Sequence, residues 1–227
     1  MWNIKRENIK KRLYLLIVIF TFLFSCYSGC LQEDLQLDNV EIKEYQGEKL
    51  SSVYDFRENS IKGPQYISQE NYTLKITGLV QPTINFSYNE LLTSFKNYKK
   101  VVTLHCVEGW SVKILWEGLL IEDLLKTTSV SNESEIIIFH AYDGYTTSLP
   151  IDFIFDNNII IAFKMNNATL PPQRGFPFQL VAESKWGYKW IKWVTEIEVS
   201  DNVDYEGYWE RRGYSNNADQ NKSFFEE

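Results

Sequence analysis

The chain has 227 residues, of which 44% are hydrophobic and 15% aromatic, a composition that indicates a packed globular protein and excludes a disordered one. Its formal net charge is -7, and the first thirty residues hold five cations and one anion, so the remainder carries -11. An acidic body argues against nucleic acid as a partner, because binding to phosphates requires clustered cations.

The first thirty residues have the pattern of a targeting segment. Basic residues run to Arg12, and the apolar stretch 13–24 that follows is shorter than the roughly 20 residues of a membrane-spanning helix. This length is typical of a secretory signal. Gly29-Cys30 resembles a lipoprotein processing site, Ser25-Cys26 is the rival site, and an uncleaved signal anchor is the alternative. We therefore expect an exported, membrane-tethered protein with a targeting segment at 1–30, an acidic tether at 31–63 and one domain at 64–227.

The domain alternates predicted strands with short helices. Ser87 and Glu90 form a capping box that predicts a short helix, and Asp143-Gly144 predicts a hairpin turn. Two more short helices are predicted at 119–125 and 150–155. Apolar or alternating runs predict strands at 72–80, 101–106, 135–141, 145–149, 159–165, 178–182 and 190–199. This order favours an α+β fold with a mixed sheet.

Three cysteines are present: Cys26 and Cys30 lie in the targeting segment, and only Cys106 lies in the predicted domain. A single thiol in an exported domain is open to oxidation. We therefore expect Cys106 to be either buried and inert or occupied by a metal. The predicted strand 101–106 delivers this thiol to a turn at Gly109, which makes it available at the end of a sheet.

Sites built from protein ligands alone are disfavoured. A structural zinc site needs four nitrogen or sulfur ligands, and the chain has only His105 and His140 beside Cys106. A copper site that adds Met165 is disfavoured because neighbouring residues on a strand, such as His105 and Cys106, point to opposite faces. A Cys106–His140 nucleophilic pair stays open as a third alternative.

A basic stretch follows the Pro/Gly-rich loop 170–177, which itself carries Arg174. Residues 185–193 concentrate lysines and tryptophans in an otherwise acidic chain. Such a cluster of cations is suited to holding an anionic group. The alternative interpretation is a solvated basic strand whose tryptophans face the core.

Three sequence blocks carry a resemblance that covers residues 70–200. They are HCVEGW with LWEGLLIEDLL, then DGYTTSLP, then LPPQRGFPFQLVAESKWGYKWIKWVTEIEVSD. In this order and spacing the chain resembles the sulfite-oxidase-type oxidoreductase molybdopterin-binding domain, and most closely the periplasmic methionine-sulfoxide reductase catalytic subunit branch. The resemblance implies a mixed-sheet, barrel-like fold with short inserted helices.

The resemblance also implies a cofactor site. Cys106 would be the catalytic residue and the single protein thiolate on the molybdenum of a molybdenum-molybdopterin cofactor, a soft ligand for this metal. The residues expected to bind the cofactor, its phosphate included, are His105, Cys106, Arg174, Lys189, Trp190, Ile191 and Lys192.

The implied chemistry is two-electron oxygen-atom transfer outside the cytoplasm on a small oxidised or oxyanion substrate, with S-oxide reduction as one such reaction. Electrons would pass singly to or from a separate haem or similar carrier. Gln179 stands where many members of the family have arginine, and the residues after Cys106 lack the paired arginines of sulfite oxidases, which argues against sulfite. The alternative is a binding or scaffold domain of the same fold that has lost the cofactor.

Overall fold

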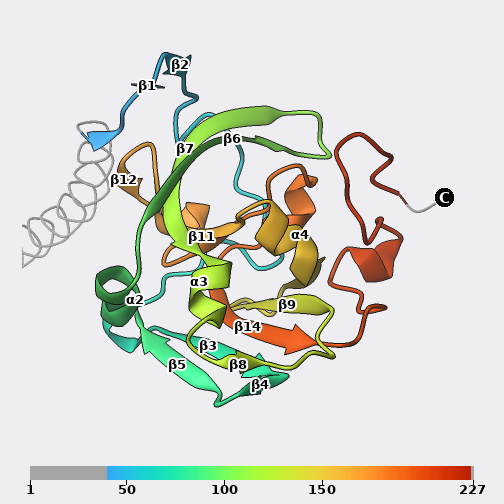
Figure 1. Cartoon of the computed structure of the whole chain (residues 1–227). Coiled ribbons are helices and arrows are strands. Elements are labelled where there is room, and N and C mark those ends of the chain that lie inside the picture. Colours follow the sequence, from blue (N-terminus) through green and yellow to red (C-terminus); the bar gives the residue numbers. More distant parts are fainter. Residues whose placement is uncertain (1–39, 226–227) are drawn as a thin grey trace, which may run out of the picture. The chain divides into compact units, whose positions relative to one another are not determined.

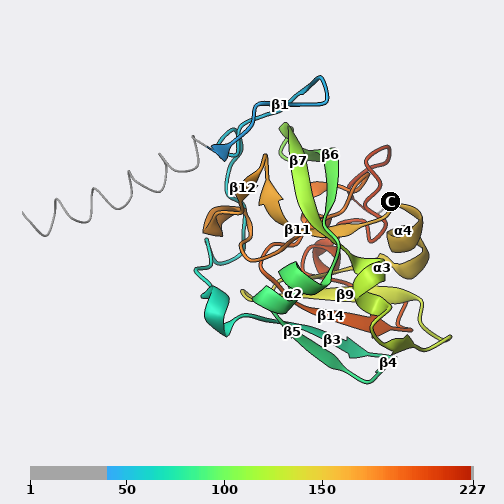
Figure 2. The same cartoon turned by 60° about the vertical axis from the view of Figure 1, so that its left-hand side comes forward.

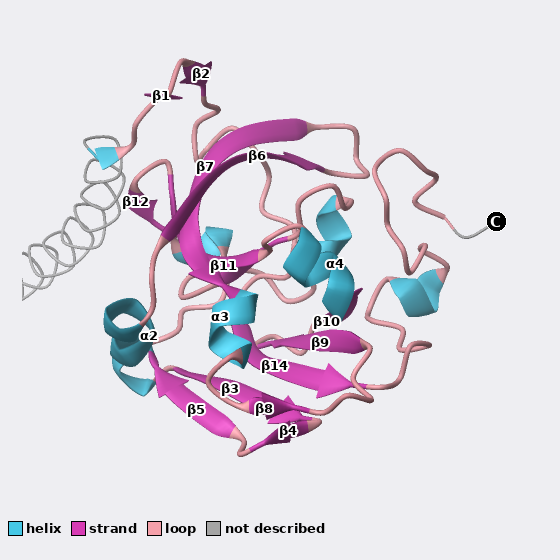
Figure 3. Cartoon of the chain, in the orientation of Figure 1, coloured by secondary structure: helices cyan, strands magenta, loops and turns pink. Residues whose placement is uncertain are grey.

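Two five-stranded β-sheets and a few short helices make up the fold (Figures 1 and 3). The computed structural model describes residues 40–225, of which those from Ile42 onward belong to one compact unit. The predictions of a targeting segment and of lipidated Cys26 or Cys30 lie outside the described residues. Among the helices of residues 40–225, none has the length and apolar character to cross a membrane.

The first sheet has the strand order β10-β9-β14-β3-β5. β14 pairs in parallel with β3 and antiparallel with β9, and the other two pairs are antiparallel, so the sheet is mixed. Its strands are β3 (Thr73–Gly78), β5 (Ile84–Ser87), β9 (Ile136–Ala141), β10 (Thr146–Pro150) and β14 (Val194–Ser200).

The second sheet has the order β12-β11-β7-β6, with β13 paired to β11. β6 and β7 form a long, curved hairpin, visible in Figures 1 and 2, and the turn between them holds Cys106. The strands are β6 (Tyr98–His105), β7 (Ser111–Leu120), β11 (Ile160–Met165), β12 (Ala168–Thr169) and β13 (Gln179–Val181).

The remaining elements are short. The two small sheets are β1 (Glu44–Tyr45) with β2 (Glu48–Lys49), and β4 (Val80–Gln81) with β8 (Ser129–Val130). The α-helices are α2 (Tyr88–Ser94), α3 (Ile121–Leu125) and α4 (Ile151–Asp156), and single 3₁₀ turns are η1 (Gln69–Asn71), η2 (Pro172–Arg174), η3 (Gly187–Lys189) and η4 (Glu210–Arg212). Figures 1 and 2 place α3 between the β6–β7 hairpin and the first sheet.

The observed elements confirm the expected α+β class. The capping box predicted at α2 forms in both directions between Ser87 and Glu90. The strand predicted at 190–199 is wrong at its start, because β14 begins only at Val194. Trp193 has a left-handed backbone with φ of 57°, which no strand residue adopts. Residues 190–193 therefore form a loop beside the site.

Candidate functional site

Cys106 lies in the tight turn that joins β6 to β7. Its N–H donates to Trp110 O at 2.9 Å, and its carbonyl accepts from Gly109 N at 3.1 Å. Gly109 closes the turn with φ of 88°, a conformation that glycine adopts without strain. The backbone thus presents the sulfur at the sheet end, as the sequence predicted.

The thiol opens onto a cavity of about 370 Å³. This volume falls within the roughly 300–1,000 Å³ that is usual for small-molecule and cofactor sites. The walls come from the β6–β7 turn, from residues 173–193, from the strap (defined as residues 53–61) and from residues near the C-terminus. The lining residues used below are Glu58, Asn59, Ser60, Cys106, Glu108, Arg174, Gln179, Trp190, Ile191, Lys192, Trp209 and Tyr214.

Cys106 is buried, with 8% of its surface exposed, but it is not enclosed by apolar side chains alone. Asn59 of the strap points its Nδ2 at the sulfur, 3.7 Å away. Burial raises the pKa of the thiol above its ordinary value, and the nearby Glu108 carboxylate also raises it. A bare thiol is therefore protonated at neutral pH, and a bound cation would be needed to hold it as a thiolate.

Arg174 fastens the strap to the cavity wall. Its Nε donates to Val53 O at 2.9 Å, its Nη2 donates to Phe56 O, and its guanidinium carbon lies 3.8 Å from the centre of the Phe56 ring. Burial lowers the pKa of Arg174, although this group stays charged at any physiological pH. The strap falls within the sequence range we predicted as a tether, yet it forms part of the cavity.

Lys192 is another cation of the cavity lining, which also contains Arg57 of the strap. Its Nζ lies 2.5 Å from Glu58 Oε1 of the strap and 3.3 Å from Gln173 O. Burial lowers the pKa of Lys192, and the Glu58 carboxylate opposes this shift. Within residues 40–225 no acceptor faces the backbone N–H of Lys192 or of Trp193, so both groups remain able to bind an anion.

Four other predicted cofactor residues have mixed positions. Trp190 and Ile191 line the cavity, but their N–H groups already donate to Gly187 O and Lys189 O. Lys189 is fully buried in an ion pair with Glu210 at 2.6 Å, and its side chain is not part of the cavity lining. The side chain of His105 does not line the cavity either, although its carbonyl borders Gly187.

The histidine alternatives find no support in this geometry. His140 lies on β9, where its Nε2 is 2.7 Å from Glu198 Oε2 of β14, and Glu196 completes a group of three possible metal ligands. None of these three residues lines the cavity that holds Cys106. This geometry therefore disfavours a Cys106–His140 pair and a copper site through both residues.

Polar side chains in the cavity indicate a site made for a polar ligand. Ser60 Oγ is buried without a hydrogen-bond partner in the described residues. Buried polar groups are normally satisfied, so this hydroxyl calls for a bound partner. Gln179 also lines the cavity and adds a side-chain amide. With the thiol, Arg174 and Lys192 nearby, the donor set fits an anionic cofactor that carries a soft metal.

A family model confirms this class of protein. The oxidoreductase molybdopterin binding domain matches residues 61–209, and the chain belongs to this family. The protein is therefore an oxidoreductase that uses molybdopterin, as the resemblance implied.

Two relatives with assigned names agree with this family assignment, one named only as an oxidoreductase and one named with a specific activity. The chain is 31% identical over 164 residues to the uncharacterized oxidoreductase YuiH of Bacillus subtilis (strain 168), which covers 71% of this chain and 82% of that protein. It is 29% identical over 148 residues to the protein-methionine-sulfoxide reductase catalytic subunit MsrP of Gluconobacter oxydans (strain 621H), covering 58% of this chain. That match spans only 47% of MsrP, so the activity of MsrP does not pass directly to this chain.

A solved structure supports the fold. The sulfane dehydrogenase SoxCD from Paracoccus pantotrophus superposes with a TM-score of 0.60 at 22% identity, over 66% of this chain and 42% of that chain. At this identity the likeness carries the fold alone. The α+β, mixed-sheet fold expected from the sequence is confirmed.

The sequence reasoning missed two parts of the site. The strap contributes Glu58, Asn59 and Ser60, which the polar composition of 31–63 concealed. The residues near the C-terminus contribute Trp209 and Tyr214. The aromatic density after residue 201 was the only signal for the second group.

Proposed function

We propose that the cavity at Cys106 binds the molybdenum-molybdopterin cofactor, with the Cys106 thiolate as the only protein ligand of the metal. The observation that carries this proposal is the position of the thiol. It opens onto a cavity that also holds Arg174, Lys192 and two free backbone N–H groups. A thiol end and an anion end in one cavity suit a ligand with a soft metal and a phosphate.

Different residues of the cavity have different roles in binding the cofactor. Lys192 and the N–H groups of Lys192 and Trp193 hold the phosphate by charge-assisted and backbone hydrogen bonds. Arg174 keeps the strap closed over the ligand, and Asn59 orients the sulfur by its contact at 3.7 Å. When bound, the cofactor supplies two-electron oxygen-atom transfer.

We infer that the reaction is the reduction of an S-oxide. Such a substrate takes up two electrons and two protons and leaves as a thioether and water. The names of the MsrP relatives support this direction, and the expected electron source is a separate one-electron carrier such as a haem protein. The lack of paired arginines after Cys106 disfavours a doubly charged sulfur oxyanion as substrate.

We also propose that the protein works outside the cytoplasm, attached to a membrane by its N-terminus. The basic residues, the apolar stretch 13–24 and the Gly29-Cys30 pair support this location. Replacing Cys30 with serine and separating membrane from soluble fractions tests the attachment. Release of the variant into the soluble fraction is the expected result, and unchanged membrane binding of both Cys30→Ser and Cys26→Ser contradicts a lipid anchor.

The decisive experiment measures metal and activity in protein purified from its native host. We expect about one molybdenum per chain and reduction of aryl or alkyl sulfoxides with a reduced viologen dye as electron donor. Cys106→Ser should keep the fold, as judged by circular dichroism, and lose turnover. A folded, metal-free protein from a host that makes the cofactor would refute the enzyme and favour a scaffold domain.

A further inference from the structure

The C-terminal segment, defined as residues 201–225, follows β14 and returns to the cavity. It contributes Trp209 and Tyr214 to the same lining as Cys106. The family match ends at residue 209, so Tyr214 and the contacts that hold it lie beyond the matched region. The segment is drawn in red in Figure 1, and only its part up to Trp209 lies within the match.

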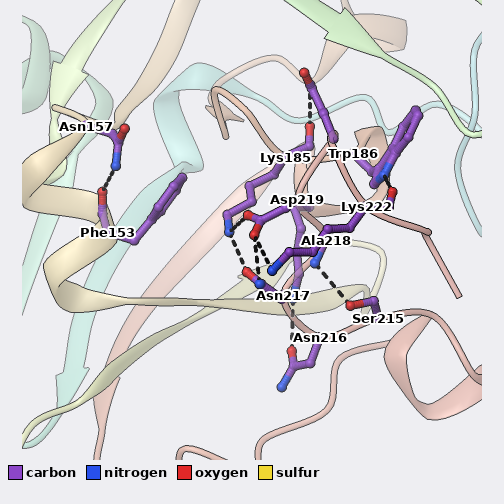
Figure 4. Close-up of polar contacts among 12 residues, drawn as sticks. Phe153, Asn157, Lys185, Trp186, Ser215, Asn216, Asn217, Ala218, Asp219 and Lys222 are labelled. Carbon is purple, nitrogen blue, oxygen red and sulfur yellow. Dashed lines mark hydrogen bonds and ion pairs between the residues drawn. The ribbon is translucent and has the colours of Figure 1, made fainter. Parts of the chain in front are cut away.

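Two lysines of the basic stretch hold the segment in place. Lys185 Nζ lies 2.6 Å from Asp219 Oδ1 and 2.9 Å from Asn217 Oδ1, as Figure 4 shows. Lys189 Nζ lies 2.6 Å from Glu210 Oε1, and both side chains of that pair are at most 1% exposed. The segment is thus fixed by charge pairs on both sides of Tyr214, of which Lys189–Glu210 is fully buried and Lys185–Asp219 partly exposed.

Backbone contacts add to this attachment. Trp186 N donates to Ala218 O at 2.9 Å, and Gln220 N donates to Ser184 O at 3.1 Å. The side-chain hydroxyl of Tyr188 donates to Ser215 O at 2.8 Å. An ordered segment with these bonds can present side chains to a ligand at defined positions.

The segment presents aromatic faces and no charge to the cavity. The rings of Trp209 and Tyr214 lie 5.1 Å apart, and Tyr214 lies 5.1 Å from Tyr188, another lining residue. The two arginines of the segment, Arg211 and Arg212, are exposed and donate to backbone carbonyls of the same segment. An aromatic wall without cations favours a neutral group over an anion.

We propose that Trp209 and Tyr214 are specificity-determining residues that bind the organic substituent of a neutral S-oxide. This inference rests on the proposed function and deepens it. Arg174, Lys192 and the free N–H groups come from residues 173–193, and Arg57 comes from the strap. These groups suit the anionic cofactor, which leaves the aromatic wall for the substrate. Ring stacking and sulfur–aromatic contacts then select S-oxides with aryl or thioether-like substituents over small ones.

The test compares two substrates in the molybdenum-loaded protein. In Trp209→Ala and in Tyr214→Ala, KM for methyl phenyl sulfoxide should rise about threefold to tenfold, the effect of one lost aromatic contact. KM for dimethyl sulfoxide and kcat for both should change less than about twofold. Trp209→Phe should restore most of the lost affinity. Val203→Ala is the control, because Val203 is an exposed apolar residue of the same segment outside the cavity lining, and it should behave as wild type.

Three results would overturn the inference. An equal rise of KM for both sulfoxides would show that the rings do not select the substituent. Loss of molybdenum from the variants Trp209→Ala and Tyr214→Ala, but not from Val203→Ala, would show that the rings pack on the cofactor. Wild-type protein that is fully loaded with molybdenum and reduces no S-oxide would refute the proposed function, and with it the inference. The first two results concern variants only and would refute the inference while leaving the proposed function intact.

Discussion

Replacing Lys189 with methionine should strongly destabilise the protein. Lys189 Nζ bonds Glu210 Oε1, Asn216 Oδ1 and Ser148 O at 2.6 to 3.1 Å, and no part of its side chain reaches solvent. The variant leaves Glu210 buried with a single remaining bond from Thr147, because its Oε2 already lacks a partner in the described residues. An uncompensated buried charge costs about 3–5 kcal/mol.

Urea unfolding at neutral pH, followed by tryptophan fluorescence, measures this loss. For a chain of this size the cost corresponds to a fall in Tm of about 6–20 °C. Lys126→Met is the matched control. Lys126 pairs with Glu122 and Asp123 at the surface with 61% of its side chain exposed, and its loss should cost less than about 1 kcal/mol. The double variant Lys189→Met with Glu210→Gln should recover much of the stability, since no buried charge is left unpaired. Stability of Lys189→Met within about 1 kcal/mol of wild type would refute the buried pair.

Three further predictions concern the strap, the thiol and the C-terminal segment. Arg174→Lys keeps the charge but loses the bonds to two strap carbonyls, so we expect lower molybdenum content and faster proteolysis within 53–61; unchanged rates would show that the strap is held by other contacts. In cofactor-free protein, iodoacetamide should alkylate Cys106 slowly at neutral pH, because burial and then the Glu108 charge raise the pKa of the thiol, and Glu108→Gln should speed the reaction; equal rates in both would exclude the influence of Glu108. Partial burial raises the pKa of Asp219, but the nearby Lys185 lowers it by more, so the net pKa is below that of a free aspartate. The Asp219 carboxylate therefore contributes stability at neutral pH, and this contribution is lost as the pH falls below about 4. Asp219→Asn should therefore be less stable than wild type at pH 7 in urea unfolding, and the difference should shrink as the pH is lowered below about 4. A difference that stays constant over this range would contradict the linkage.

The sequence predicted those parts of the fold that local patterns determine. The apolar run at β9, the turn at Asp143-Gly144 and the capping box at α2 are local signals, and all three are confirmed. β7 was missed because Lys113, Glu117 and Gly118 interrupt its apolar pattern. A Cβ at Gly118 would lie 2.2 Å from Ile161 O, so this glycine serves the close approach of β11 and does not mark the start of a helix. The need for a glycine at this position arises from packing against a strand distant in sequence, so no local sequence pattern indicates it.

The site likewise contains residues that local patterns predict and residues whose roles depend on distant contacts. Cys106 was predicted because a β-rich run ends at a turn, which is a local feature. The role of Lys189 could not be read correctly from sequence, since its partner Glu210 lies 21 residues further on in a segment without a periodic pattern. The strap was likewise hidden, because polar residues that line a cavity and polar residues of a linker have the same composition.

The pairing of the lysines changes how this chain can hold an anionic cofactor. The basic stretch supplies three lysines, but Lys185 and Lys189 are neutralised by acids of the C-terminal segment, and Lys192 is neutralised by Glu58 of the strap. The stretch therefore adds little net positive charge to the cavity, in agreement with the acidic body of the chain. A phosphate must either displace Glu58 or bind beside it on the free N–H groups of Lys192 and Trp193. Because the lysine charges are already paired, the bond between metal and Cys106 has to provide a larger share of the affinity than the number of lysines in this stretch implies.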